Sequence, residues 1–229
     1  MKYFRAIHYP VKHILVMIFG LTAINCSGQH KPVSREESPA RIKHQLDSID
    51  EVDQRYRAQL ETVAARHGGD SPQMKMLWDS IRYTDSLNMV YVSHIIDTYG
   101  WLGPDEIGSD ANRTLFMVVQ HSTTPEQQKY LPIMREAVKA GKAKGSSLAL
   151  LEDRVALREG RAQLYGSQLS WNTITNEYYV QPIEDPDHVD ERRAALGLPP
   201  MATYILDCCN LVWDVEAFKR DGRSLKRRE

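Results

Sequence analysis

The sequence predicts a mostly α-helical domain, an α-rich α+β fold with one small β-hairpin late in the chain. Two observations support this class. Apolar residues recur every three or four positions over long stretches of the first two thirds of the chain, which is the period of an amphipathic helix. After Gly160 the chain becomes rich in aromatic and β-branched residues, which favour strands. We therefore expect helices first and a hairpin afterwards.

The chain begins with the features of a secretory signal peptide. Lys2, Arg5 and Lys12 form a positively charged region, and residues 14–24 form an uncharged apolar run. The run is shorter than the roughly 20 residues that a membrane-spanning helix needs, and its length suits a secretory signal. An uncleaved anchor or a buried helix is the alternative. We expect residues 1–26 to be a signal peptide.

Cys26 follows this run directly, in the stretch LTAINC, and resembles the lipidated cysteine of bacterial lipoproteins. Ala23 and Asn25 depart from the usual lipobox, so ordinary cleavage near this point is the alternative. Lipidation of Cys26 would make the membrane a partner, because acyl chains anchor a protein firmly when more than one is attached. The sequence thus favours an exported envelope protein, either a membrane-anchored lipoprotein or a periplasmic one, with residues 27–37 as a flexible polar tether.

A single domain is expected over residues 38–220. Ser38-Pro39 and Ser71-Pro72 have the composition of helix starts, with a capping serine before a proline. The first helix is expected over 39–63, where residues of the apolar face recur, and the HGGD stretch ends it. The second helix is expected to continue at least to Ile96, before the glycine- and proline-containing YGWLGPDEIG stretch.

Three further helices precede the hairpin. Ser109 is expected to cap a buried helix that ends at His121, and Thr124-Pro125 starts another helix through about Ala140. Ser146 or Ser147 is expected to cap the next helix, which ends near Gly160. Strands are then expected in AQLYGSQLSW and EYYVQPIE, followed by a helix from Asp185-Pro186 to Gly197, an ambiguous apolar segment, and a charged tail over residues 221–229.

Composition excludes some functions. The formal net charge is −1, which offers no basic stripe for nucleic acid. The eight histidines have no metal-ligand spacing, and HExxH, GxSxG, P-loop and GxGxxG motifs are missing from the sequence, so no metal and no cofactor is predicted. Apart from Cys26 the cysteines are Cys208 and Cys209, which we expect to be buried free thiols; a vicinal disulfide or a metal pair is the alternative.

The helix ending near Gly160 carries the first candidate site. It is apolar nearly all round, yet it contains Asp153 and Arg154, and buried charges are costly unless they are paired. His121 ends the neighbouring buried helix. A pair of His121 with Asp153 would form a general base. The alternative is structural: His121 caps its helix, and Asp153 satisfies Arg154 or a backbone group.

The stretch QLYGSQ carries the second candidate site. In a strand, Gln163 and Tyr165 would point to the same face. Together with Gln168 they supply amides and a phenol, which recognise polar ligands and are weak nucleophiles. The alternative is a twisted hairpin in which Gly166 is needed only because glycine permits a bulge or a close approach of the backbone.

Five stretches occur in an order that resembles an uncharacterised bacterial family, domain of unknown function 6624. They are IDEVDQRYR, YGWLGPDEIG, VVQHS, LEDRVALREGRAQLYGSQ and ERRAALGLPP, and they cover roughly residues 49–199. The resemblance implies no reaction. It singles out the positions that match the family's signature, which are Asp53, Gln54, Arg57, His121, Asp153, Arg154, Gln163, Tyr165, Gly166 and Gln168. Family members usually have threonine where this chain has Ser167.

Two functional hypotheses follow. The first is a binding or interaction module for a small polar ligand or another envelope protein, with ligand contacts from Gln163, Tyr165, Gln168, Asp53, Gln54 and Arg57. The second is a hydrolase in which His121 and Asp153 form the base while Arg154 or Gln168 stabilises developing charge. The cluster is rich in recognition groups and poor in nucleophiles, so the first hypothesis is favoured.

Overall fold

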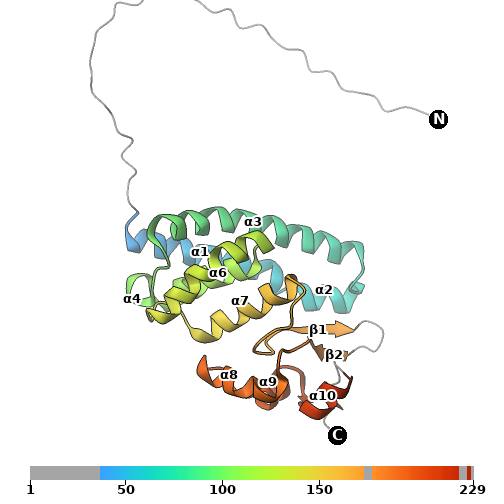
Figure 1. The fold of residues 1–229 in the computed structure, drawn as a ribbon. Coiled ribbons are helices and arrows are strands. Elements are labelled where there is room, and N and C mark those ends of the chain that lie inside the picture. The colour runs from blue at the N-terminus through green and yellow to red at the C-terminus, as the bar shows by residue number, and fades with distance from the viewer. Residues whose placement is uncertain (1–36, 173–176, 222–225, 228–229) are drawn as a thin grey trace, which may run out of the picture. The chain divides into compact units, whose positions relative to one another are not determined.

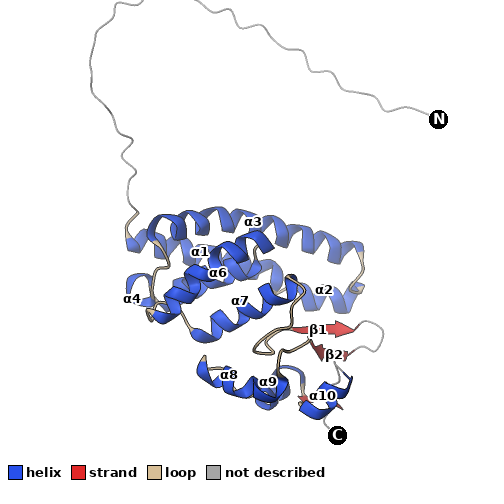
Figure 2. Cartoon of the chain, in the orientation of Figure 1, coloured by secondary structure: helices blue, strands red, loops and turns tan. Residues whose placement is uncertain are grey.

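The computed structural model describes residues 37–172, 177–221 and 226–227. The predicted signal peptide, Cys26 and nearly all of the predicted tether lie outside the described residues. Within them the chain is mostly helical with a small antiparallel hairpin late in the sequence, so the predicted fold class is confirmed (Figure 2).

The first two thirds of the chain form a helical layer around one hydrophobic core (Figure 1). Helix α5, which contacts α1, α3, α6 and α7, carries eight buried residues out of thirteen. That burial explains the continuous apolar run in its sequence. The main helices of this part are α1 (Pro39–Arg57), α3 (Pro72–Tyr99), α5 (Ser109–His121), α6 (Thr124–Lys139) and α7 (Gly145–Arg158), with the short α4 (Pro104–Ile107) before α5.

The helix predicted over residues 39–63 is two helices in the structure. Helix α1 ends at Arg57, and α2 (Leu60–His67) follows after a two-residue turn. The apolar period continues through the turn because Tyr56, Leu60 and Val63 pack on a separate small cluster with the first turns of α3. The sequence pattern therefore predicted the buried face correctly and missed the break.

The remaining residues form a second hydrophobic cluster of their own. The hairpin pairs Leu169 with Val180 in an antiparallel register. Short elements follow it, and Met201 and Ile205 are fully buried at the centre of the cluster. The elements of this part are β1 (Leu169–Asn172), β2 (Glu177–Val180), η1 (Pro186–His188), α8 (Val189–Ala195), α9 (Met201–Cys209), β3 (Leu211–Val212), α10 (Val215–Asp221) and β4 (Lys226–Arg227).

The hairpin begins later than the sequence predicted. The stretch from Gln163 to Gln168 is a loop, and only Gln163 makes an isolated bridge, to Ile183. Gly166 has a φ of +66°, which interrupts any strand at this point. The pattern of aromatic and β-branched residues thus located the hairpin but placed the start of its first strand too early.

The C-terminal segment is apolar on one side and thiol-bearing at its end. Cys208 and Cys209 are free thiols in the last turn of α9, as expected, but Cys208 is exposed and Cys209 is half-buried, so the expected burial is wrong. Partial desolvation and the contact with the Cys209 thiol raise the pKa of the Cys208 thiol to about 12, so it stays protonated at neutral pH. Two residues of the predicted charged tail pair through their backbones with β3. None of the helices in the described part of the chain combines the length and the apolar character needed to cross a membrane.

Candidate functional site

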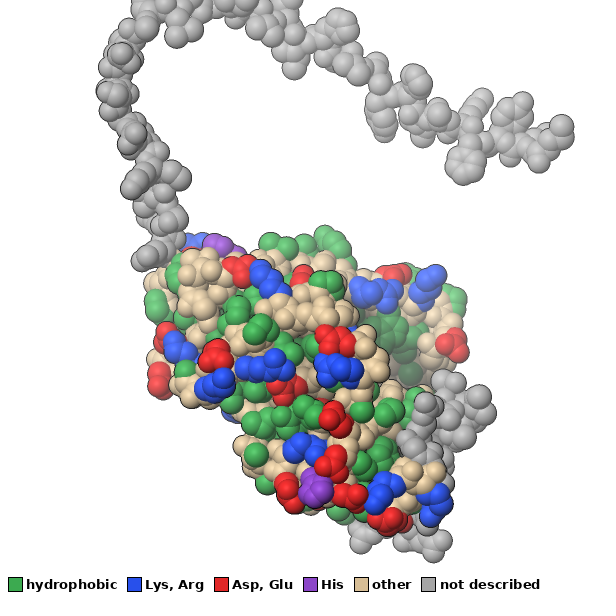
Figure 3. Space-filling view, in the orientation of Figure 1, with side chains coloured by type: hydrophobic (Ala, Val, Ile, Leu, Met, Phe, Trp, Pro, Cys, Tyr) green, Lys and Arg blue, Asp and Glu red, His purple; other side chains and the backbone are tan. Residues whose placement is uncertain are grey.

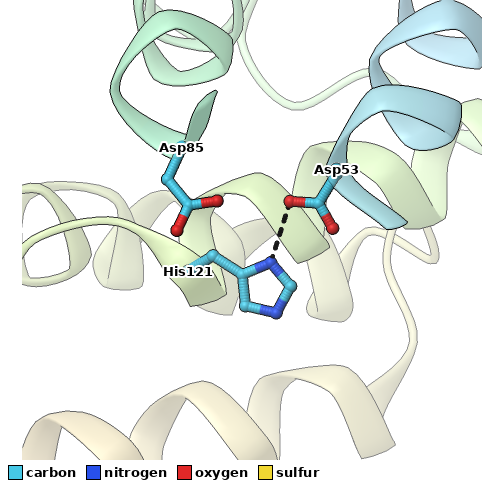
Figure 4. A group of neighbouring side chains, drawn as sticks. All are labelled: Asp53, Asp85 and His121. Atoms are coloured by element: carbon cyan, nitrogen blue, oxygen red, sulfur yellow. Dashed lines mark hydrogen bonds and ion pairs between the residues drawn. The ribbon is translucent and has the colours of Figure 1, made fainter. Parts of the chain in front are cut away.

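Four helices bring a group of charged side chains together at one end of the helical layer. We define the charged cluster as Asp53, Arg57, Asp85, His121, Arg154 and Arg158. Asp53 and Arg57 lie one turn apart on α1, Asp85 lies on α3, and His121 is the last residue of α5 (Figure 4). Arg154 and Arg158 lie one turn apart on α7. Asp53 is only 2% exposed, so this carboxylate is buried and needs partners.

His121 and Asp53 form the central contact. His121 Nδ1 lies 3.1 Å from Asp53 Oδ1, and Gln54 Nε2 donates to the other carboxylate oxygen at 2.7 Å. With Nδ1–H donating to Asp53, the neutral imidazole carries its free lone pair on Nε2. Figure 4 shows Nε2 on the side of the ring away from both carboxylates. No residue of the described chain hydrogen-bonds to it.

Arg57 joins the two carboxylates. Its Nη2 donates to both oxygens of Asp85, at 2.8 and 2.9 Å, and its Nη1 lies 3.7 Å from Asp53 Oδ1. Burial raises the pKa of Asp85 above its ordinary value, and the nearby Arg57 offsets only part of this effect. The ion pair between Arg57 and Asp85 is therefore partly shielded from water.

Arg154 and Arg158 differ from Arg57, because no carboxylate of the described residues pairs with them. Arg154 Nη1 donates to the carbonyl of Gln120 at 2.9 Å, and Arg158 Nη1 donates to the carbonyl of Ser122 at 3.1 Å. The two guanidiniums thus bind the backbone on either side of His121. Burial, with the repulsion of Arg158 and Arg57, lowers the pKa of Arg154 to about 10. Three guanidiniums face two carboxylates, so the charged cluster carries a net charge of +1 with His121 neutral.

A cavity of about 370 Å³ opens beside this cluster, and we call it the His121 cavity. Asp85, His121 and Arg158 line it. The other lining residues are polar: Arg82, Ser86, Ser122, Thr123 and Glu126. Glu126 is already bound to the backbone N–H and the hydroxyl of Thr123 as a helix cap. Arg158 has one hydrogen bond to the described chain, so most of its five N–H donors face solvent in this cavity.

A metal ion is the other occupant that the geometry suggests. Ligand atoms of Asp53, Asp85 and His121 all lie within 4.8 Å of one another. Arg57 already pairs with both carboxylates, however, and its positive charge would repel a cation at the same place. The side-chain chemistry therefore fits an anion beside Arg158 better than a cation beside Arg57.

The predicted pair of His121 with Asp153 is not formed. Both Asp153 oxygens bind backbone instead: Oδ1 accepts from the N–H groups of Leu164 and Tyr165 at 2.7 and 2.9 Å, and Oδ2 accepts from that of Ser167 at 2.8 Å. Asp153 is fully buried and is committed to holding this loop. The structural alternative, in which Asp153 satisfies backbone groups, is the one that the geometry supports.

The other candidates from QLYGSQ also hold the loop. Gln163 is fully buried, and its amide binds the backbones of Gln168 and Gln181. Tyr165 donates its hydroxyl hydrogen to Glu152 at 3.0 Å, and burial raises its pKa. Gln168 Oε1 accepts from Arg154 at 3.3 Å, which makes Arg154 the link between this loop and the charged cluster.

The structure thus divides the signature residues into two groups. Asp53, Gln54, Arg57, His121 and Arg154 lie together around the charged cluster, while Asp153, Gln163, Tyr165, Gly166 and Gln168 shape the loop. Sequence reasoning missed Asp85 and Arg158. Asp85 lies one turn from the buried Ile81 and Asn88, on the inner face of α3, and Arg158 lies one turn after Arg154. These helical spacings could have identified both residues from the sequence.

Fold and site together define a class of protein: a helical domain with a partly buried charged cluster beside an open polar cavity. The chain belongs to the Family of unknown function (DUF6624), whose model matches residues 40–214. The predicted resemblance is therefore confirmed, and the match contains the whole charged cluster and the loop. Comparison with curated proteins and with solved structures finds no match to the chain.

Proposed function

We propose that this protein binds a small anionic ligand, carrying a phosphate or carboxylate group, in the His121 cavity. One observation carries the proposal: Arg154 and Arg158 bracket His121 without a carboxylate partner among the described residues. The half-buried guanidinium of Arg154 is costly without a counter-ion, and a ligand oxyanion held by the exposed Arg158 would supply one nearby. The net positive charge of the charged cluster also favours an anionic ligand.

The cavity has the groups that such a ligand needs. Arg158 offers uncommitted N–H donors for a bidentate contact with an oxyanion. His121 Nε2 accepts a hydrogen bond when the ring is neutral and donates one when it is protonated. Arg57 and Asp85 neutralise each other nearby, which leaves the surplus positive charge on the α7 side of the cavity.

Calorimetric titration with inorganic phosphate, glycerol phosphate, acetate and succinate tests this proposal. We expect at least one of them to bind, and Arg158→Ala to weaken that binding about tenfold or more, since charge-assisted hydrogen bonds are the strong ones. Arg161→Ala is the matched control: Arg161 is an exposed arginine close by that pairs with Glu159. Equal losses in both variants, or binding that ignores Arg158→Ala, would rule out the proposed site.

A second candidate function is hydrolysis, and the orientation of His121 favours it. Its Nδ1 is fixed on a buried carboxylate while its Nε2 faces away from the carboxylates and has no partner among the described residues, so the ring is set up to take a proton from water. Here Asp53 replaces Asp153 as the residue that orients the base. Arg158 would stabilise the negative charge that develops on the attacked group.

Phosphate-ester and carboxylate-ester substrates separate the two functions. A hydrolase loses activity in His121→Ala and Asp53→Asn, whereas a binding module turns over none of the substrates and still binds the anion. Glu159→Gln, at an exposed carboxylate of the same region, is the control that should leave either property unchanged. Activity that survives His121→Ala would exclude His121 as the base.

We propose further that the domain is exported and attached to the bacterial cell envelope through lipidated Cys26. The charged start of the chain, the apolar run and the following cysteine support this proposal. Metabolic labelling with a palmitate analogue tests it: the wild-type protein should be labelled in a bacterial host and the Cys26→Ser variant should not. Labelling of both proteins would contradict lipidation at Cys26.

A further inference from the structure

A second cavity lies between the first turns of α5 and α7, and the interactions of its lining residues differ from those of the His121 cavity. Its volume is about 230 Å³. The two cavities have no lining residue in common. The lining residues are Trp101, Ser109, Asn112, Arg113, Phe116, Met117, Met134, Ala143, Lys144, Ser146 and Ser147. We call it the α5–α7 cavity.

The inner part of the α5–α7 cavity is apolar and tightly packed. Trp101, Phe116 and Met134 are 4%, 5% and 0% exposed. Asn112 fixes one wall, because its amide nitrogen donates to the carbonyls of Leu102 and Lys142 at 2.7 and 2.8 Å. The cavity is thus built from side chains that are held in place.

Hydrogen-bond donors around this cavity have been left without acceptors. The indole N–H of Trp101 is buried and has no partner within the described chain. The hydroxyls of Ser109, Ser146 and Ser147 also form no hydrogen bond with any described residue. Ser109 is exposed and Ser146 and Ser147 are half-buried, so these hydroxyls are open to water and can donate instead to a ligand with acceptor oxygens.

Charge around the cavity favours a negative ligand. The N-termini of α5 and α7 both meet here, and neither helix has a side-chain cap at its start. Uncapped helix starts present backbone N–H groups and a partial positive charge. Lys144 forms no ion pair within the described residues. Arg113 forms an ion pair with Asp50 at 2.8 Å. None of the lining residues is acidic.

From these observations we infer that the α5–α7 cavity is a second binding site, which takes a small carboxylate with an apolar body. The carboxylate lies at the start of α7, near Lys144, Ser146 and Ser147. The apolar body lies against Phe116 and Met134, beside the Trp101 ring. Size restricts the ligand to a short acyl or aryl chain, because the cavity is below the usual range of about 300–1,000 Å³ for drug-sized ligands.

Nuclear magnetic resonance of the indole N–H groups in the full-length protein tests the inference directly. The probe is hexanoate, with 1-hexanol as the uncharged analogue of the same length. We expect hexanoate to shift one indole resonance, and Trp101→Phe to remove that resonance. Lys144→Ala should weaken binding several-fold. Lys139→Ala, an exposed lysine of α6 paired with Glu136, is its control.

The proposals for the two cavities can be tested independently of each other. Arg158→Ala should leave hexanoate binding unchanged, and Lys144→Ala should leave anion binding in the His121 cavity unchanged. The inference is overturned if hexanoate shifts no resonance that Trp101→Phe removes, or if hexanol binds as tightly as hexanoate. Hexanoate binding that is lost only in Arg158→Ala would assign it to the first cavity and also overturn the inference.

Discussion

Asp153 is a signature residue whose side chain has a structural role. One carboxylate accepts three backbone N–H groups from a loop eleven to fourteen residues later in the chain. Hydrogen bonds to charged groups are worth about 1.5–3 kcal/mol each, and a fully buried carboxylate has no access to water as a replacement partner.

We predict that Asp153→Asn lowers the free energy of unfolding by about 3 kcal/mol, because the amide NH₂ cannot accept from backbone donors. The melting temperature should fall by roughly 6–12 °C for a domain of this size. Calorimetry measures both. Asp79→Asn, at a surface pair whose carboxylate is 60% exposed, should change stability by less than about 0.5 kcal/mol. A similar small effect at Asp153 would contradict its structural role.

Asp85 allows a prediction about pH. Burial raises its folded pKa above the ordinary value of 3.8 despite the contact with Arg57. A carboxyl with a raised folded pKa contributes stability that is present below its unfolded pKa and is lost as pH rises through its folded pKa. We therefore expect the stability of the wild type, relative to Asp85→Asn, to decrease as the pH rises above the ordinary value of 3.8. Urea unfolding of both proteins at several pH values measures the difference. An increase would mean that the Arg57 pair outweighs burial.

The loop from Gln163 to Gln168 is the element whose shape the sequence predicted least well. Gly166 explains why this element cannot be a strand. A Cβ on this residue would lie 2.7 Å from Met201 Sδ and 2.9 Å from Ile183 Cδ1, and its φ of +66° disfavours side chains. The residue is therefore restricted both by backbone conformation and by space.

Two alanine substitutions separate these restrictions. Gly166→Ala should destabilise the domain by about 2–3 kcal/mol, the sum of strain and overpacking. Gly197→Ala has a φ of +72° and open space around the added Cβ, so it should cost only about 1 kcal/mol of strain. Chemical denaturation of the two variants gives the comparison. Equal costs would show that Met201 and Ile183 move aside without penalty.

The helices were predictable because each one has a local cause. Ser38 and Ser71 cap α1 and α3 in front of a proline, as the sequence indicated. The start of α7 was not predictable in the same way, since Lys144 occupies the capping position and Ser146 and Ser147 lie inside the helix. The reason lies outside the helix: a Cβ on Gly145 would lie 2.9 Å from the Leu196 carbonyl, so a tertiary contact sets this end.

The charged cluster was predictable only in part, because its contacts join residues far apart in the chain. His121 and Asp53 are separated by 68 positions, and nothing local distinguishes Asp53 from Asp153 as the partner of His121. Family resemblance correctly singled out both aspartates without assigning their roles. Burial of each carboxylate against different donors decided which one contacts the histidine.

At the scale of the whole molecule the domain has two main hydrophobic cores in the described residues, and each has its own element set. The surface in Figure 3 mixes blue and red side chains, which fits the near-zero net charge and the absence of a nucleic-acid face on this side of the described chain. The loop from Gln163 to Gln168 connects the two parts through hydrogen bonds: Asp153 of α7 accepts from the Leu164 N–H, and Arg193 Nη1 of α8 donates to the Tyr165 carbonyl at 2.6 Å. Such a connection allows one part to open before the other.

We predict that Ile205→Ala loosens the C-terminal part selectively. The side chain is fully buried, and removing it should cost about 2–5 kcal/mol, mostly within its own core. Hydrogen exchange should then speed up in α9 while α3 stays protected, because local opening reflects local stability. Leu151→Ala, in the other core, should instead speed up exchange throughout. Uniform acceleration by Ile205→Ala would show that the two cores unfold as one unit.

The short sequence distance between Asp153 and the loop it holds has a consequence for synthesis of the protein. Contacts between residues close in the chain form quickly, because little chain entropy is lost in closing them. Once translation has passed Gln168, every group that Asp153 binds has been made, while the C-terminal core still lacks Met201 and Ile205. The order of emergence from the ribosome therefore favours a preformed loop on which the C-terminal core assembles later.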